Sequence, residues 1–249
     1  MNLAKNGNNF IPCIITNKHV IEGTECVFIR FHLSDQNKPS GKYFTYGLKI
    51  DKSGCLFHPD PDVDLCAFNI VNILERAVND GKPIFRQTIP LNFIPPETDW
   101  DYFDALEDVV MVGCPNGISD EFNNLPIFRR GITASSLTKN YNGKNEFLVD
   151  MACYPGSSGS PIFVYNTNGF LDRRQDAFAI DRQRLVFVGV LYAGPQISHY
   201  GRQVLTKPPS IAVDTMMHLG HAIRSTAIKI LDDEARKLKA VCLTPPANI

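Results

Sequence analysis

The chain has 249 residues, of which 44% are hydrophobic and 20% are charged, a composition typical of a globular protein with a buried core. The length suits one large domain or two small ones. The 25 basic and 26 acidic residues leave a formal charge of −1 without a basic block, which excludes the electrostatic surface that nucleic-acid binding requires.

Short apolar or β-branched runs separated by turn residues dominate the first two hundred positions. Many short strands at this spacing predict an all-β fold of sandwich or barrel type. The predicted strands span residues 10–16, 25–32, 43–50, 65–70, 108–113, 130–135, 146–151, 160–165 and 185–193. A short helix is expected at 72–79, and the charged, non-periodic segment 169–184 is expected to be a surface loop.

A proline-rich stretch between Lys82 and Ala105 has few periodic runs and indicates a crossover between two halves. We therefore expect a first β-barrel half at 1–82, the crossover at 83–107, a second β-barrel half at 108–212, and a C-terminal helix and tail at 213–249.

Apolar residues in the tail recur at steps of three and four, which places them on one face of a helix. They are Met216, Leu219, Ile223, Ala227 and Ile230. Asp214 or Thr215 is a candidate cap for the start of this helix. We expect its apolar face to pack on its own domain, and the alternative is a helix that binds a partner.

The cysteines are seven, an odd number, and most of them lie inside apolar runs. They are Cys13, Cys26, Cys55, Cys66, Cys114, Cys153 and Cys242. Buried free thiols in a reducing compartment are the simplest interpretation. No close pair of the C-x-x-C kind occurs, so no zinc or other metal site is expected.

No apolar run is long enough to span a bilayer, and Met1–Asn9 is polar and lacks the apolar stretch of a signal peptide. We expect a cytoplasmic location and no membrane partner.

The segment Gly156-Ser157-Ser158-Gly159-Ser160-Pro161 has the composition of a nucleophile turn. A serine hydroxyl needs a base within hydrogen-bond reach and donors directed at the developing oxyanion. Gly156 can adopt the backbone angles that turn its N–H toward that oxygen, and the N–H of Ser158 is the second donor. Taken alone, the segment is equally consistent with a flexible polar turn.

A base and an orienting carboxylate are available earlier in the chain. His19 follows an apolar strand and is a candidate general base, because histidine as a residue type titrates near neutrality, although a lone histidine is more often a surface or capping residue. Asp64 lies among Val63, Leu65, Cys66 and Ala67, where a carboxylate entering a buried strand needs a partner such as an imidazole.

Two other acids compete with Asp64 for this role. Asp60 and Asp62 lie in the run His58-Pro59-Asp60-Pro61-Asp62, which resembles an exposed turn. Asp64 is therefore preferred.

Four segments together resemble the bacterial trypsin-like serine peptidases, the group that includes the HtrA-type enzymes. The segments around His19, Asp64 and Ser158 are similar to the three catalytic motifs of that group, in the same order. The fourth match joins residues 112–117 to 130–134 and resembles the strand pair that opens the second barrel. The resemblance covers roughly residues 10 to 195 and implies a chymotrypsin-like double β-barrel without a PDZ module.

The resemblance also implies a mechanism. His19 would take the proton of Ser158 as the hydroxyl attacks a peptide carbonyl, Asp64 would hold the imidazole, and the N–H groups of Gly156 and Ser158 would bind the oxyanion. The acyl group would then be released by water, and no cofactor is expected.

The resemblance, aligned on Ser158, also implies which residues bind the substrate. It puts Ala152 at the base of the primary pocket, and Tyr192, Ala193 and Gly194 on the strand that lines it. Since Ala152 carries no charge, an apolar or small side chain is expected in the pocket.

The N-terminus departs from the family pattern, because Met1–Asn9 lacks the usual first-strand motif. We expect either that the assigned start of the chain is late, or that the first barrel is open or completed in another way. Two functions remain open: an active endopeptidase on protein or peptide substrates, or an inert peptidase fold that serves as a binding or sensing module. Neither a regulatory partner nor an oligomeric state can be read from the sequence.

Overall fold

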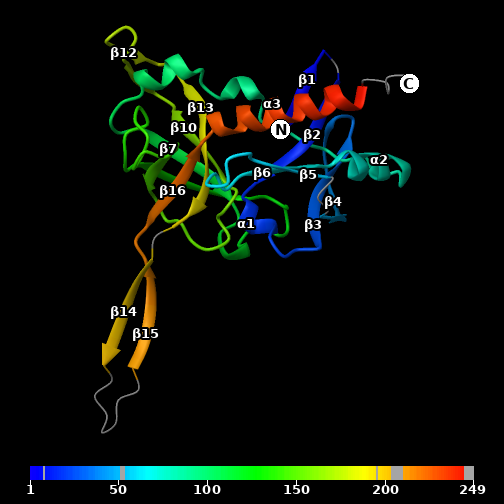
Figure 1. Cartoon of the computed structure of the whole chain (residues 1–249), viewed down its shortest axis with the longest axis horizontal. Helices are drawn as coiled ribbons and strands as arrows, with labels where there is room; N and C mark the ends of the chain where they lie inside the picture. The colour runs from blue at the N-terminus through cyan, green and yellow to red at the C-terminus, as the bar shows by residue number, and fades with distance from the viewer. Residues whose placement is uncertain (8, 51–53, 195, 203–209, 244–249) are drawn as a thin grey trace, which may run out of the picture.

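The structure, a computed structural model, describes residues 1–7, 9–50, 54–194, 196–202 and 210–243. The end of the expected tail, residues 244–249, lies outside the described residues. Two β-rich halves lie side by side, and a C-terminal helix crosses the first strands of the chain (Figure 1). The prediction of a mainly β chain with a C-terminal helix is confirmed.

Six strands of the second half close into an antiparallel barrel in the order β10-β13-β16-β9-β8-β7. They are β7 (Asp108–Gly113), β8 (Ile127–Thr133), β9 (Glu146–Asp150), β10 (Pro161–Asn166), β13 (Arg184–Ala193) and β16 (Leu219–Arg224). Alternate side chains of the strands point into the barrel and fill it. Val109, Met111, Phe147, Val149 and Ile162 are almost completely buried there.

The first half contains an antiparallel sheet in the order β1-β2-β6-β5 and a separate hairpin, β3–β4. The strands are β1 (Asn2–Asn6), β2 (Asn9–Thr16), β3 (Cys26–Asp35), β4 (Lys38–Lys49), β5 (Cys55–Phe57) and β6 (Cys66–Asn69), with α1 (Lys18–Ile21) after β2 and α2 (Val71–Asn79) after β6. Tyr46, Phe68 and Ile73 join hairpin, sheet and α2 in one apolar cluster. Among the described residues, this half is therefore an open sheet with a hairpin packed on it, while the second half closes.

The N-terminus forms a first strand, β1, although it lacks the usual first-strand motif. Strand β1 pairs antiparallel with β2, and the backbone N–H of Ala4 donates to Asp232 Oδ1 at 2.6 Å. Arg236 also donates to the carbonyl of Lys5 at 3.0 Å. Both partners belong to the C-terminal helix α3 (Thr226–Leu243), so a polar strand with no periodic signal is held by contacts from the far end of the chain.

The start predicted for the C-terminal helix, near residue 213, is wrong, because α3 begins at Thr226. Asp214 and Thr215, the expected caps, lie in strand β15 (Ser210–Met216), and β16 closes the barrel between β13 and β9 before α3 begins. A step of four residues is two strand periods as well as about one helical turn, so Leu219 and Ile223 fit both patterns.

Helix α3 packs on its own domain, as expected. Ala227, Ile228, Leu231 and Ala235 join Leu3 and Leu65 in one buried cluster, whereas Ile230 is 41% exposed and is not part of the buried face. No helix in the described part of the chain is long and apolar enough to cross a membrane.

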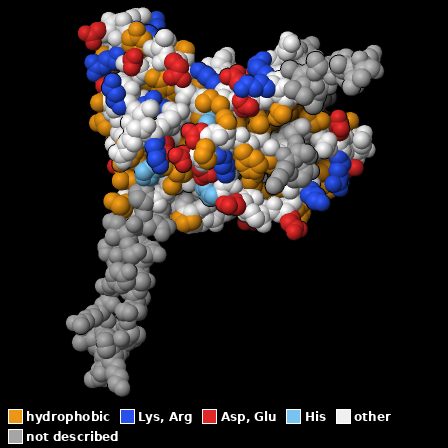
Figure 2. Space-filling view, viewed as in Figure 1, with side chains coloured by type: hydrophobic (Ala, Val, Ile, Leu, Met, Phe, Trp, Pro, Cys, Tyr) orange, Lys and Arg blue, Asp and Glu red, His pale blue; other side chains and the backbone are white. Residues whose placement is uncertain are grey.

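All nine predicted strands are present, with end shifts of a few residues, and the predicted helix at 72–79 is α2. The loop expected at 169–184 is instead a hairpin of β11 (Gly169–Asp172) and β12 (Ala177–Ile180). A second hairpin joins β14 (Gln196–Arg202) to β15 and extends away from the body (Figure 1). On the face shown in Figure 2, acidic and basic side chains are interspersed.

The crossover runs as irregular chain with the 3-10 turns η1 (Leu91–Phe93) and η2 (Glu97–Tyr102), and η3 (Pro115–Gly117) follows β7. Trp100 and Phe103 anchor the crossover in the core of the second half, with their ring centroids 5.5 Å apart.

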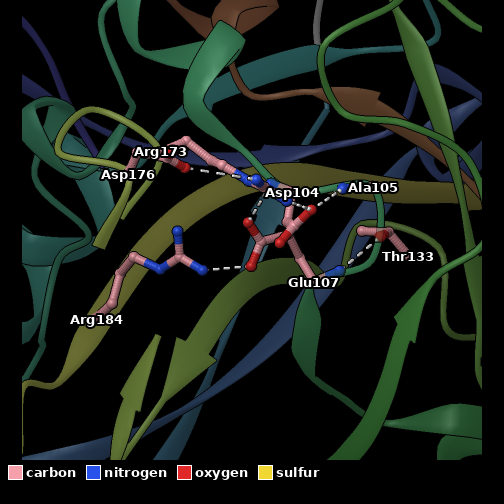
Figure 3. Close-up of polar contacts among 7 residues, drawn as sticks. All are labelled: Asp104, Ala105, Glu107, Thr133, Arg173, Asp176 and Arg184. Carbon is pink, nitrogen blue, oxygen red and sulfur yellow. Dashed lines mark hydrogen bonds and ion pairs between the residues drawn. The ribbon is translucent and has the colours of Figure 1, made fainter. Parts of the chain in front are cut away.

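Ion pairs fasten the end of the crossover to the second half (Figure 3). Glu107 is almost fully buried and pairs with Arg184 of β13, while its backbone N–H donates to Thr133 Oγ1 at 3.0 Å. Asp104, which is more exposed than Glu107, forms an ion pair at 2.9 Å with Arg173 in the turn between β11 and β12. The guanidinium of Arg173 lowers the pKa of the Asp104 carboxyl.

Replacing Arg184 tests the buried pair. Because Arg184→Ala leaves a buried carboxylate without its cation, the free energy of unfolding should fall by about 3–5 kcal/mol in urea denaturation. The matched control, Arg173→Ala, removes the ion pair of an exposed arginine and should lower the free energy of unfolding far less. Equal losses of unfolding free energy in the two variants would contradict the prediction that the burial of Glu107 makes its pair the costlier one to break.

Candidate active site

His19 and Asp64 meet where two paired strands end. Strands β2 and β6 are antiparallel, and Thr16 pairs with Cys66, so the residues just beyond Thr16 and just before Cys66 are neighbours. Asp64 Oδ2 lies 2.5 Å from His19 Nδ1, and the backbone N–H of His19 donates to Asp64 Oδ1 at 3.2 Å. Both carboxylate oxygens therefore engage the same histidine, which fixes the position of its ring.

Neighbouring residues hold the Asp64 segment in place. The side-chain amide of Asn17, which is fully buried, donates to the backbone carbonyl of Asp64 at 2.8 Å. Asp60 and Asp62 lie in an exposed turn in which Asp60 Oδ1 accepts from the Asp62 N–H at 2.9 Å. Of the three acids, Asp64 is the one whose carboxylate contacts His19.

The serine segment forms a compact turn between β9 and β10. The Ser157 N–H donates to the Tyr154 carbonyl, and the Ser160 N–H donates to the Ser157 carbonyl. Gly156 has φ +80°, a conformation that favours glycine, and a Cβ there would lie 3.0 Å from the Asn116 nitrogen. Among the hydrogen bonds of the described residues, none is donated by the backbone N–H of Gly156 or Ser158, so both donors are available to an oxygen outside the chain.

The turn lies directly against the strand that leads to His19. A Cβ on Gly159, whose φ is +84°, would meet Thr16 Oγ1 at 2.7 Å. The hydroxyl of Ser158 donates to the carbonyl of Tyr192 at 3.3 Å, and no hydrogen bond joins it to His19 among those of the described residues. The fold thus brings the serine turn and the histidine strand together, while the serine side chain itself is turned toward β13.

A cavity of about 270 Å³ opens beside Ser158. It is lined by Cys153, Tyr154, Pro155, Ser158, Leu191, Tyr192, Ala193 and Gly194. The lining includes three of the predicted substrate-binding residues, but Ala152 is not among them. Ala152 follows the end of β9 in irregular chain, so its position relative to Ser158 in the sequence does not set the direction of its side chain.

A polar cluster that the sequence did not suggest lies beneath the end of β13. The hydroxyl of Tyr192 donates to Glu146 Oε2 at 2.8 Å, and His221 Nδ1 lies 3.8 Å from the same oxygen. Burial and the hydrogen bond to Glu146 raise the pKa of the Tyr192 hydroxyl. Glu146 and His221 stood in apolar runs without a motif, so only strand pairing could join them to Tyr192.

A second cavity, of about 350 Å³, also borders Ser158 and is lined by residues of both halves. Thr16, Val20 and Ile21 line it from the His19 side, and Cys114 and Gly156 line it from the serine side. Ser158 therefore borders both cavities.

The expectation of buried free thiols holds for some of the cysteines. Cys13, Cys66 and Cys153 are buried free thiols, and burial raises the pKa of the Cys153 thiol to about 11. Cys26 and Cys114 are exposed, contrary to that expectation. The described residues contain no group of three or more His, Cys, Asp or Glu side chains placed to hold a metal ion.

Comparison with known families identifies the fold. The model of the trypsin-like peptidase domain matches residues 3–171, more than half of the chain. The chain belongs to the family of trypsin-like peptidase domains.

The remaining comparisons add little to this assignment. No curated protein matches the chain. One solved structure that resembles this trypsin-like domain is the inactive form of Rv3671c from M. tuberculosis H37Rv, a serine-to-alanine mutant. The two chains are 12% identical, the match covers 96% of this chain and 82% of that one, and the TM-score is 0.37, too low to support any further conclusion.

Proposed function

We propose that this trypsin-like domain is a serine endopeptidase in which Ser158, His19 and Asp64 form the catalytic triad. The observation that carries the proposal is that both Asp64 oxygens contact His19, at 2.5 Å and 3.2 Å. The serine turn lies beside them, and no hydrogen bond within the described part of the chain uses the N–H of Gly156 or Ser158. A peptidase domain implies peptide or protein substrates.

Asp64 acts on His19 and does not touch the substrate. With Nδ1 bound to the carboxylate, the lone pair of His19 Nε2 is left to accept a proton. The same carboxylate stabilises the imidazolium that forms when that proton arrives.

Ser158 must turn from Tyr192 toward His19 before it can react. Rotation about its Cα–Cβ bond exchanges the 3.3 Å hydrogen bond to the Tyr192 carbonyl for one to His19 Nε2. Catalytic hydrogen bonds are often long or misaligned without substrate and tighten when it binds. The close approach of the Gly159 turn to Thr16, three residues before His19, supports this rotation.

The reaction then follows acyl transfer. The Ser158 oxygen attacks the peptide carbonyl as its proton passes to His19, and the oxyanion receives hydrogen bonds from the N–H groups of Gly156 and Ser158. His19 returns the proton to the leaving amine. Water, deprotonated by His19, then releases the acyl group and restores the serine.

The cavity beside Ser158 accounts for substrate preference in this proposal. None of its lining side chains carries a full charge, and Cys153 is neutral because burial raises the pKa of its thiol to about 11. A Lys or Arg side chain would lose its hydration there without gaining a counter-charge. An uncharged side chain therefore fits on the N-terminal side of the cleaved bond.

A fluorophosphonate probe tests the nucleophile. Wild type should label, and Ser158→Ala should not, because the probe reacts with an activated serine hydroxyl. Ser157→Ala is the matched control and should label as wild type does, since its hydroxyl is buried. A wild-type chain that fails to label while remaining folded would instead support an inert binding or sensing module.

Exchange of single acids tests the orienting role of Asp64. Asp64→Asn should lower kcat by about 10⁴-fold, because the amide favours the wrong tautomer of His19. Asp60→Asn alters an acid in the exposed turn and should leave kcat within about twofold, as judged by hydrolysis of a peptide ester. Comparable losses in both variants would remove the reason for preferring Asp64.

A peptide library tests whether the cavity beside Ser158 prefers uncharged side chains. Cleavage should follow uncharged residues, with cleavage after Lys or Arg at least about tenfold less frequent because of the desolvation penalty. Mass spectrometry of the products reads the preference directly. Cleavage mainly after Lys or Arg would contradict it.

A further inference from the structure

The hairpin of β14 and β15 continues the strand pair that borders Ser158. Ala193 of β13 pairs with His221 of β16, and the ladder resumes beyond the cavity with Gln196 opposite Met216. It then runs through seven pairs to Arg202 opposite Ser210. Strands β13 and β14 thus form one side of a nearly continuous ribbon, and β15 and β16 form the other.

One edge of this ribbon is unpaired from the active site outward. Strand β10 covers β13 only as far as the pair of Pro161 with Val190. Beyond that point, Tyr192, Ala193 and Gly194 border the cavity, and the Tyr192 carbonyl accepts the Ser158 hydroxyl. Strand β14 pairs with β15 alone among the described strands, so its opposite edge continues the free edge of β13.

An isolated hairpin of this kind needs a partner. Two-stranded ribbons are at best marginally stable in water, and a free strand edge is a template for another extended chain. The hairpin of β14 (Gln196–Arg202) and β15 (Ser210–Met216), called the arm from here on, extends away from the rest of the protein (Figure 1). With seven residues in each strand, it offers an edge of about 20 Å.

The chemistry proposed for the site decides which chain fits that edge. His19 protonates the leaving amine, so the part of the substrate C-terminal to the cleaved bond lies on the His19 side, toward the cavity lined by Val20 and Cys114. The part N-terminal to the bond must leave past Tyr192 and Gly194. Paired antiparallel to β13, it runs straight onto the free edge of β14.

We propose that the β14–β15 arm binds the N-terminal side of an extended, unfolded polypeptide substrate by adding it as a third strand to β14. This inference rests on the proposed peptidase function and deepens it. Main-chain hydrogen bonds supply most of the affinity in such strand addition, so the arm selects substrates by extension and length more than by sequence.

The test compares substrates of different length on two forms of the protein. A cleavage site is first mapped in β-casein, an unfolded protein, by mass spectrometry. Three peptides are then made: a short one around that site, one extended by eight residues on the N-terminal side, and one extended equally on the C-terminal side. The arm is removed by replacing residues 197–215 with an Asn-Gly turn between the paired Gln196 and Met216.

In wild type, the N-terminal extension should raise kcat/KM by about tenfold through a lower KM, as a few net hydrogen bonds would provide. The C-terminal extension should add little. In the armless form this gain should vanish, while the short peptide should be cleaved at the wild-type rate. Absence of the gain in wild type, or its survival without the arm, would overturn the inference.

Two further measurements distinguish a failure of the proposed peptidase function from a failure of the inference about the arm. Fluorophosphonate labelling of both forms reports whether the serine is active, independently of the arm. Fluorescence anisotropy with Ser158→Ala reports binding of the same peptides without turnover, and the N-terminal extension should tighten it by a similar factor. If light scattering shows a dimer that becomes monomeric without the arm, and the length effect persists, the arm joins two copies of the chain and the inference is wrong.

Discussion

Two backbone hydrogen bonds between the serine turn and β13 hold the site together. The Gly159 N–H donates to the Leu191 carbonyl at 2.8 Å, and the Leu191 N–H donates to the Ser160 carbonyl at 2.9 Å. They place Ser158 beside Tyr192, at the point where β13 leaves the cover of β10. The cavity, the position of the nucleophile and the base of the arm all depend on this register.

Strand β13 can hold this register because it is buried on both faces. Phe187 and Val190 pack in the cluster shared with β1 and α3, while Val188 and Leu191 pack in the core of the second barrel. A slip by one residue would move buried side chains out of the core that each one fills, and the close packing of both cores opposes it. The packing that stabilises the fold is therefore also what aligns the serine turn with the histidine strand.

The two chain ends contribute to the same arrangement. Helix α3 follows β16 directly and packs on Leu3 and Leu65, so the C-terminus supports the sheet that carries His19 and Asp64. The contact of Asp232 with the N–H of Ala4 satisfies a donor near the edge of that sheet. The first half is thus stabilised by helix α3, which explains how an open sheet can hold His19 Nδ1 and Asp64 Oδ2 only 2.5 Å apart.

Local signals in the sequence determined a good deal about this protein. Runs with a strand period located most of the strands, and the motifs around His19, Asp64 and Ser158 pointed to residues that the fold places in one region. These signals are local: a strand period, a glycine needed at a positive φ, and an acid set among apolar residues.

The remaining strands and the layout of the site were decided by pairing between segments that are distant in the sequence. No local sequence signal predicts that pairing. β1 and β16 have little pattern of their own, or one that fits a helix as well, and they are strands because β2, β9 and β13 offer them partners. Three features depend on how the strands lie beside one another. Cys153 lines the cavity in place of Ala152, the Tyr192 hydroxyl bonds to Glu146, and a free edge runs from β13 into β14. A strand edge is free or covered only once the tertiary structure has placed its neighbours.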